Sequence, residues 1–250
     1  MKNFQKKYVS GMLALFALVL PTMGRAFELT PMTQTFEPAG RNINRTFEVK
    51  NDSDEGVAVT LTIKARTLDA TGAETLRDTK DFAIFPTQIM LKSKAAQVVR
   101  VQWQGDAFLS SEQSYRIIAE EVPLKAAAVY PSGSVMAIKL VLRFGGTIYV
   151  ASPLARADVV IASAKAVKTP KGELLDIVLE NRGTRHAIID QPSVNLTSGE
   201  MTGVVSSAAV DKALAGENIL AGSSRSISLP WPENMPVGPV EAKLKASFLQ

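Results

Sequence analysis

Side chains that commonly carry out catalysis or hold metals are sparse in this chain of 250 residues. It contains no cysteine and a single histidine, His186. Zinc sites and thiol chemistry need several such residues, and a Ser-His-Asp relay would have only one base to use. His186 follows the run Arg182-Gly183-Thr184-Arg185, which is typical of a turn, so we expect a solvated histidine.

Two further patterns could suggest chemistry, and neither supports it. The adjacent pair Glu120-Glu121 would point to opposite faces of a strand, which does not make the paired carboxylates of a glycosidase. Gly145-Gly146 lies within a strand-like stretch rather than before a helix, so a bulge or bend fits better than a phosphate loop. The sequence therefore predicts no enzyme, no metal site and no cofactor.

The first 26 residues have the features of a secretory signal peptide. Three lysines precede an apolar run and a small-residue site: Lys2, Lys6 and Lys7, then Val9–Met23, then Gly24-Arg25-Ala26. The run is shorter than the roughly 20 residues that span a membrane, so we expect cleavage before Phe27 and no membrane insertion.

Cleavage there would also change the charge of the protein. Residues 1–26 hold four of the 28 Lys and Arg and none of the 24 Asp and Glu. The remainder is therefore formally neutral, with no general electrostatic attraction to nucleic acid or anionic lipid.

The elements that would position any site are short segments of alternating polarity. Val57, Val59, Leu61 and Ile63 alternate with smaller or polar residues, as in a sandwich strand with one buried face. The first half of the chain holds about seven such segments, the number that an immunoglobulin-like sandwich uses. We predict strands at 27–37, 45–50, 57–64, 83–91, 97–103, 115–122 and 135–150.

A short connection at 151–156, containing Pro153, separates this half from a second one with the same pattern. We therefore predict two domains, 27–152 and 153–250, each an immunoglobulin-like sandwich in an all-β protein. The strands expected in the second domain are 159–167, 174–180, 187–189, 193–197, 224–229 and 240–249. The Ala- and Ser-rich stretch 204–218 could hold a helical turn.

The longest alternating segment runs through Ser134–Phe144. Five apolar residues fall on one face of it: Met136, Ile138, Leu140, Leu142 and Phe144. This face could line the core of its own domain, because alternation is what every sandwich strand shows. It could also be offered to a partner.

Several motifs along the chain resemble the periplasmic pilus chaperones of the PapD-like family, most closely the archaic branch. They are Leu29-Thr30-Pro31, Phe36–Gly40, Thr46–Asn51, Phe85-Pro86, Gln97–Val101, Glu112–Pro123, Leu179–Gly183 and Ile219–Arg225. The resemblance implies two sandwiches in an L-shaped arrangement, a location in the periplasm, and pilus subunits and an outer-membrane usher as partners.

The resemblance also implies that the segment at 135–144 is the donor strand, which completes a subunit that lacks its last strand. Its five apolar residues would then enter the groove of the subunit, and self-association is expected to mask them in the free protein. Two alternatives remain open, a secreted β-sandwich structural subunit and a ligand-binding module.

Relatives in this family hold the terminal carboxylate of the subunit with an arginine and a lysine. The matching positions here are Thr33 and Thr147. Arg116, Lys139 and Arg143 are basic residues nearby that could replace this anchor, or could be solvated strand charges.

Overall fold

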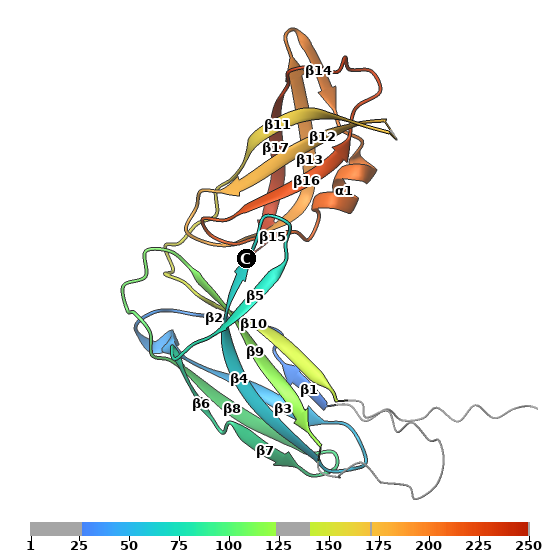
Figure 1. Ribbon diagram of the computed structural model, residues 1–250. Helices are drawn as coiled ribbons and strands as arrows, with labels where there is room; N and C mark the ends of the chain where they lie inside the picture. The colour runs from blue at the N-terminus through green and yellow to red at the C-terminus, as the bar shows by residue number, and fades with distance from the viewer. Residues whose placement is uncertain (1–26, 124–140, 171, 250) are drawn as a thin grey trace, which may run out of the picture.

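The computed structural model describes residues 27–123, 141–170 and 172–249, which form two β-sandwiches (Figure 1). The predicted signal peptide lies outside these residues, as do Met136, Ile138, Lys139 and Leu140. The sandwich strands were predicted from alternation, and the all-β, two-sandwich fold is confirmed.

Two sheets build the N-terminal domain. One has the order β1-β3-β8-β6, and the other has the order β2-β10-β9-β4-β5, with β7 also paired to β4. The strands are β1 (Phe27–Thr30), β2 (Thr33–Phe36), β3 (Asn44–Asn51), β4 (Val57–Leu68), β5 (Glu74–Asp78), β6 (Phe82–Phe85), β7 (Gln88–Leu91), β8 (Ala96–Trp103), β9 (Gln113–Val122) and β10 (Arg143–Val150). A short 3-10 helix at Arg41–Ile43 precedes β3.

Two of the predicted strands are wrong as single elements. The stretch 27–37 divides into β1 and β2, and the stretch 83–91 divides into β6 and β7. In both cases the two halves join different sheets, and the break contains a proline, Pro31 or Pro86. Proline has no N–H to give to a ladder, so the chain leaves one sheet at that point and enters the other.

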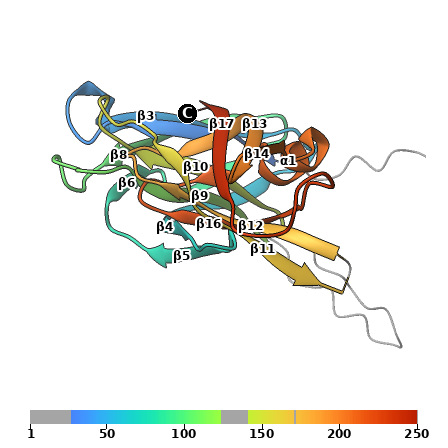
Figure 2. The same ribbon diagram turned by 90° about the horizontal axis from the view of Figure 1, so that it is seen from above.

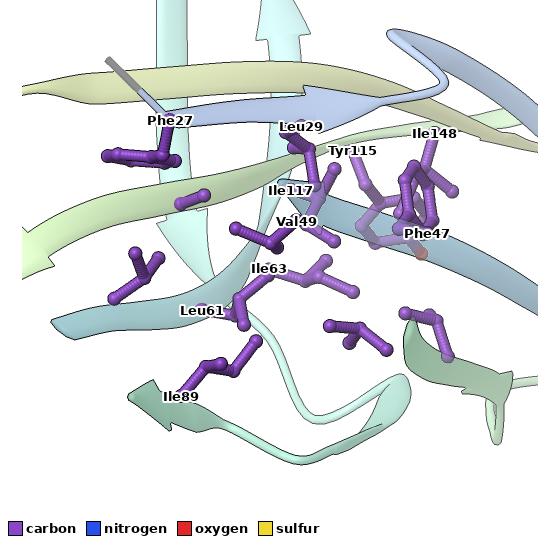
Figure 3. Packing of buried hydrophobic residues seen from close by; sticks show 14 of the residues in the cluster. Phe27, Leu29, Phe47, Val49, Leu61, Ile63, Ile89, Tyr115, Ile117 and Ile148 are labelled. Atoms are coloured by element: carbon purple, nitrogen blue, oxygen red, sulfur yellow. The ribbon is translucent and has the colours of Figure 1, made fainter. Parts of the chain in front are cut away.

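The core of the N-terminal domain lies between its two sheets (Figure 3). Leu61 and Ile63 of β4 face Phe47 and Val49 of β3 across it, as the alternation predicted. At one end, Tyr115 packs edge-on against Phe82 and Trp103, with ring centroids 4.9 and 5.8 Å away. Burial is the main reason why the pKa of Tyr115 lies well above its ordinary value. The hydrogen bond of 2.8 Å from its hydroxyl to Asp81 raises the pKa further.

The C-terminal domain repeats the architecture with fewer strands. Its first sheet has the order β11-β12-β16; in its second, β13 pairs with β14, β15 and β17. The elements are β11 (Val159–Thr169), β12 (Gly172–Asn181), β13 (Ala187–Ser198), β14 (Met201–Val204), α1 (Ser207–Leu214), β15 (Asn218–Ile219), β16 (Ser224–Pro230) and β17 (Glu241–Leu249). The helical turn predicted within 204–218 is α1, which buries Val210 and Leu214 against the core.

One strand of this domain was predicted as two. The stretches 187–189 and 193–197 belong to β13, whose register shifts between Asp190 and Ser193. Gln191 has a positive φ of 47° at this point, so the apolar alternation is interrupted although the strand continues.

The two sandwiches meet end to end at an angle, in the bent arrangement that was predicted (Figure 1). The β11–β12 hairpin projects from the C-terminal domain in Figure 1 and in the view from above in Figure 2. Within the described part of the chain, no helix is long and apolar enough to cross a membrane.

Candidate functional site

The first half of β10 is an open sheet edge. Arg143–Gly146 pair with β9 on one side, through the register Arg143↔Glu120 to Gly146↔Ile117. On the other side, β2 begins its parallel pairing only at Thr147. Among the described residues, this stretch therefore has a ladder partner on one side, and its other main-chain groups are free to pair with a further strand.

The described donor-strand residues face the core of their own domain. Leu142 and Phe144 are half-buried against it, and the Phe144 ring lies 4.9 Å from that of Phe27 in an edge-on contact. Val141 and Arg143, on the other face, are exposed. The interpretation of this face as domain core thus holds for Leu142 and Phe144 in the free chain, and their contact with a subunit stays a prediction.

The two threonines that replace the usual anchor lie side by side. Thr147 of β10 is in register with Thr33 of β2 on one side and with Arg116 of β9 on the other. The guanidinium Nη1 of Arg116 donates a hydrogen bond to Thr147 Oγ1. Arg116 thus contacts Thr147, one of the two positions at which the resemblance implies a basic residue.

The second described candidate, Arg143, lies elsewhere. Its guanidinium is 3.7 Å from Glu120, and both side chains are more than half exposed. An exposed pair of this kind contributes little, about 0–1 kcal/mol. In the free chain Arg143 is thus an exposed strand charge, and its role in holding a carboxylate stays a prediction.

A second arginine and a glutamate, neither predicted, complete the cluster around Arg116. Arg66 of β4 has a side chain only 7% exposed, and its Nε donates to Glu74 Oε1 at 2.6 Å. The same oxygen accepts from Arg116 Nε at 2.9 Å. The alternation of β4, continued beyond Lys64, puts Arg66 on the same face of the strand as Lys64, so the sequence could have revealed Arg66. Glu74 lies on β5, a strand that nothing in the sequence predicted.

This cluster borders a cleft of about 330 Å³ between the two domains. Arg66, Glu112 and Ser114 line its N-terminal side, and Leu220 and Ser223 line its C-terminal side. A cleft with an apolar lining and a few convergent polar groups is the usual form of a ligand site. Within the described part of the chain, no cluster of three or more His, Asp or Glu side chains could hold a metal.

The prediction of a solvated His186 is wrong. Its side chain is 1% exposed, and its ring stacks on Tyr149 with centroids 3.7 Å apart. Glu112 accepts hydrogen bonds from the backbone N–H of His186 and lies 2.8 Å from Nδ1. The turn that carries His186 is covered by the other domain, and a local pattern cannot reveal such cover.

Residues 35–145 match the family model described as pili and flagellar-assembly chaperone, PapD N-terminal domain. The match spans most of the N-terminal sandwich. Among curated protein sequences, none matches the chain.

Solved structures of pilus chaperones share the fold across both domains. A chaperone–tip adhesin complex of CFA/I fimbriae is 14% identical, with a TM-score of 0.55 over 88% of this chain and 98% of that one. The SafB chaperone bound to the SafA pilin of Salmonella enterica is 13% identical, with a TM-score of 0.52 over 91% and 93%.

A third structure comes from an archaic system, the branch predicted from the sequence. It is the complex of CsuC with the CsuE tip subunit from Csu pili of Acinetobacter baumannii. It is 13% identical, with a TM-score of 0.50 over 80% of this chain and 89% of that one. The N-terminal domain of the chain is therefore similar to the PapD N-terminal domain of the pilus chaperones, and the two-sandwich fold is shared with such chaperones.

Proposed function

We propose that this protein is exported to the periplasm, holds pilus subunits by lending them a β-strand, and delivers them to an outer-membrane usher. The observation that carries the proposal is the open edge of β10 over Arg143–Gly146. Strand addition to such an edge is an established mode of peptide recognition, in which main-chain hydrogen bonds supply the affinity.

The side chains available for this task support the proposal. The alternation seen at Leu142 and Phe144 extends in the sequence through Leu140, Ile138 and Met136. Each large apolar side chain that leaves water contributes about 1.5–3 kcal/mol before the cost of ordering. Several such residues in one phase would fill the groove of a sandwich that lacks a strand.

The partners of similar proteins point in the same direction. Two of the similar structures are complexes with tip adhesin subunits, and another contains a pilin. The present chain builds both sheets around a continuous core within its N-terminal domain, which argues against its being an incomplete structural subunit. We expect the free protein to self-associate through the same edge, because an unpaired apolar edge is prone to pairing.

The anchor for the carboxylate of the subunit is assigned in this proposal to Arg116 with Arg66. Both guanidinium groups belong to the cluster beside the interdomain cleft, and Arg116 touches Thr147 at the position of the missing lysine. Arginine suits this task, because its planar donors match the geometry of a carboxylate. Lys139 lies outside the described residues and is not needed for this arrangement.

The test is a charge placed on the donor face. Leu140→Glu should abolish accumulation of a pilus subunit produced together with this chain, because a carboxylate would be buried in an apolar groove. Immunoblotting of periplasmic extracts measures the effect. Val141→Glu is the matched control, since Val141 is an exposed neighbour in the same segment, and its subunit level should stay within about twofold of wild type. Undiminished accumulation with Leu140→Glu would overturn strand donation.

A further inference from the structure

Glu74 holds the two cleft arginines through a single oxygen. Its Oε1 accepts from the Nε atoms of Arg66 and Arg116, at 2.6 and 2.9 Å. Paired carboxylates and arginines usually share two parallel hydrogen bonds, which engage both oxygens. Here Nη1 of Arg66 donates to Ser114, and Nη1 of Arg116 donates to Thr147. Within the described residues, the Nη2 atom of neither arginine donates a hydrogen bond.

The cluster carries a surplus positive charge. Two arginines against one glutamate leave a formal charge of +1, and the neighbouring Lys64 is neutralised by Asp78 on the next strand. Glu74 is 31% exposed, and Arg116 is 25% exposed, so solvent and ligand can reach them. Arg66 also lines the interdomain cleft.

Glu74 occupies this position because of β5. The β4–β5 hairpin extends the sheet beyond β4, with Arg66 in register with Leu76 and Leu68 in register with Glu74. The tip of the hairpin also contacts the other domain, since Ser226 N–H donates to the Ala70 carbonyl at 2.8 Å. The carboxylate is thus held beside the arginines by a hairpin whose strand β5 pairs with β4 and whose tip contacts the C-terminal domain.

We propose that Glu74 is an internal counter-ion that stands in for the terminal carboxylate of the subunit in the free chaperone and competes with it for Arg66 and Arg116. The inference rests on the proposed function, and it adds a residue that sets the strength of carboxylate capture. In the free protein Glu74 keeps the guanidinium groups ordered and compensates their charge. On binding, the incoming carboxylate takes over their Nε and Nη2 donors, and Glu74 turns toward solvent.

The test compares one peptide in two forms. The peptide is the C-terminal strand of a pilus subunit that accumulates only when this chain is produced with it, prepared with a free C-terminal carboxylate and as the C-terminal amide. Binding to the full-length mature protein is measured by fluorescence polarisation. We expect wild type to bind the acid more tightly than the amide. Glu74→Gln should bind the acid about tenfold more tightly than wild type and the amide equally well, because the surplus charge rises by one.

A second carboxylate on the same strand supplies the matched control. Asp78→Asn removes the same charge from β5 without touching either arginine, and it should leave the preference for the acid within about twofold of wild type. Thermal melts confirm that both variants are folded. Equal gains with both substitutions would overturn the proposal, because the effect would then come from the general field of the strand.

The remaining outcomes separate the two proposals. If wild type prefers the acid but Glu74→Gln leaves its affinity unchanged or weakens it, the competition is wrong, whereas capture of the carboxylate by a basic residue of the chain stands. If acid and amide bind alike in every variant, both the competition and the arginine anchor are wrong. In either case strand donation is judged by the separate effect of Leu140→Glu.

Discussion

At the scale of single residues, each domain has a buried asparagine at the end of a strand, and its side chain binds the turn that follows. Asn181, at the end of β12, is fully buried. Its Nδ2 donates to the carbonyls of Arg185 and Ile219, and its Oδ1 accepts from the N–H groups of Asp158 and Gly183. Asn51 at the end of β3 binds its own turn in the same manner. Each amide thus satisfies main-chain groups that water cannot reach.

Asn181→Ala should therefore lower the free energy of unfolding of the C-terminal domain by about 2–5 kcal/mol. The substitution strands several buried main-chain groups, and each one costs about 1–3 kcal/mol, partly relieved by relaxation. Urea unfolding followed by circular dichroism measures the change. Asn234→Ala at an exposed site is the control and should have an effect below about 0.5 kcal/mol. A loss under about 1 kcal/mol for Asn181→Ala would contradict the assignment.

At the scale of elements, the strands with one buried face could be predicted and the others could not. In β4, Val57, Val59, Leu61 and Ile63 are all buried, so the period of two was visible in the sequence. In β5, Glu74–Asp78, no residue is buried, so it offers no such period. The consequence reaches the site, because the missed strand carries Glu74. His186 was misjudged for a related reason, since its cover comes from Tyr149 in the other domain.

The two glycines of β10 test how closely the strands approach one another. A Cβ on Gly146 would lie 2.9 Å from Cγ2 of the buried Ile117 and 3.3 Å from the carbonyl oxygen of Met32, where the chain passes from β1 to β2. A Cβ on Gly145 would meet nothing within 4 Å. The glycine pair thus marks a close approach of strands at its second position, whereas the sequence suggested a bulge or bend.

We expect Gly146→Ala to destabilise the N-terminal domain by about 1–3 kcal/mol, because neither the Ile117 side chain nor the Met32 carbonyl can move without disturbing β10. Gly145→Ala should be neutral or slightly stabilising, since it lowers the entropy of the unfolded chain. Urea unfolding of both variants and of wild type measures the difference in the free energy of unfolding. Equal stabilities would show that the strands relax freely at this point.

At the scale of the whole molecule, the angle between the domains depends on a small polar interface. Glu112 accepts from His186 across the junction, His186 stacks on Tyr149, and the Tyr149 hydroxyl accepts from Asn218 Nδ2 at 2.6 Å. The backbone adds a bond from Glu112 N–H to the Thr184 carbonyl at 2.9 Å. Together with the hydrogen bond from Ser226 N–H to the Ala70 carbonyl, these contacts hold the two domains on either side of the cleft beside Arg66.

Glu112→Ala should loosen the junction, because it leaves the buried N–H and Nδ1 of His186 without their hydrogen-bond partner, and each stranded group costs about 1–3 kcal/mol. The absence of cysteine allows spin labels to be placed at Gln97→Cys and Glu200→Cys without background. The distance distribution between the labels should broaden in Glu112→Ala. It should be unchanged in Glu180→Ala, which removes an exposed pair with Arg182. A narrow distribution in Glu112→Ala would mean that the backbone contacts and the Tyr149–His186 stack set the angle without Glu112.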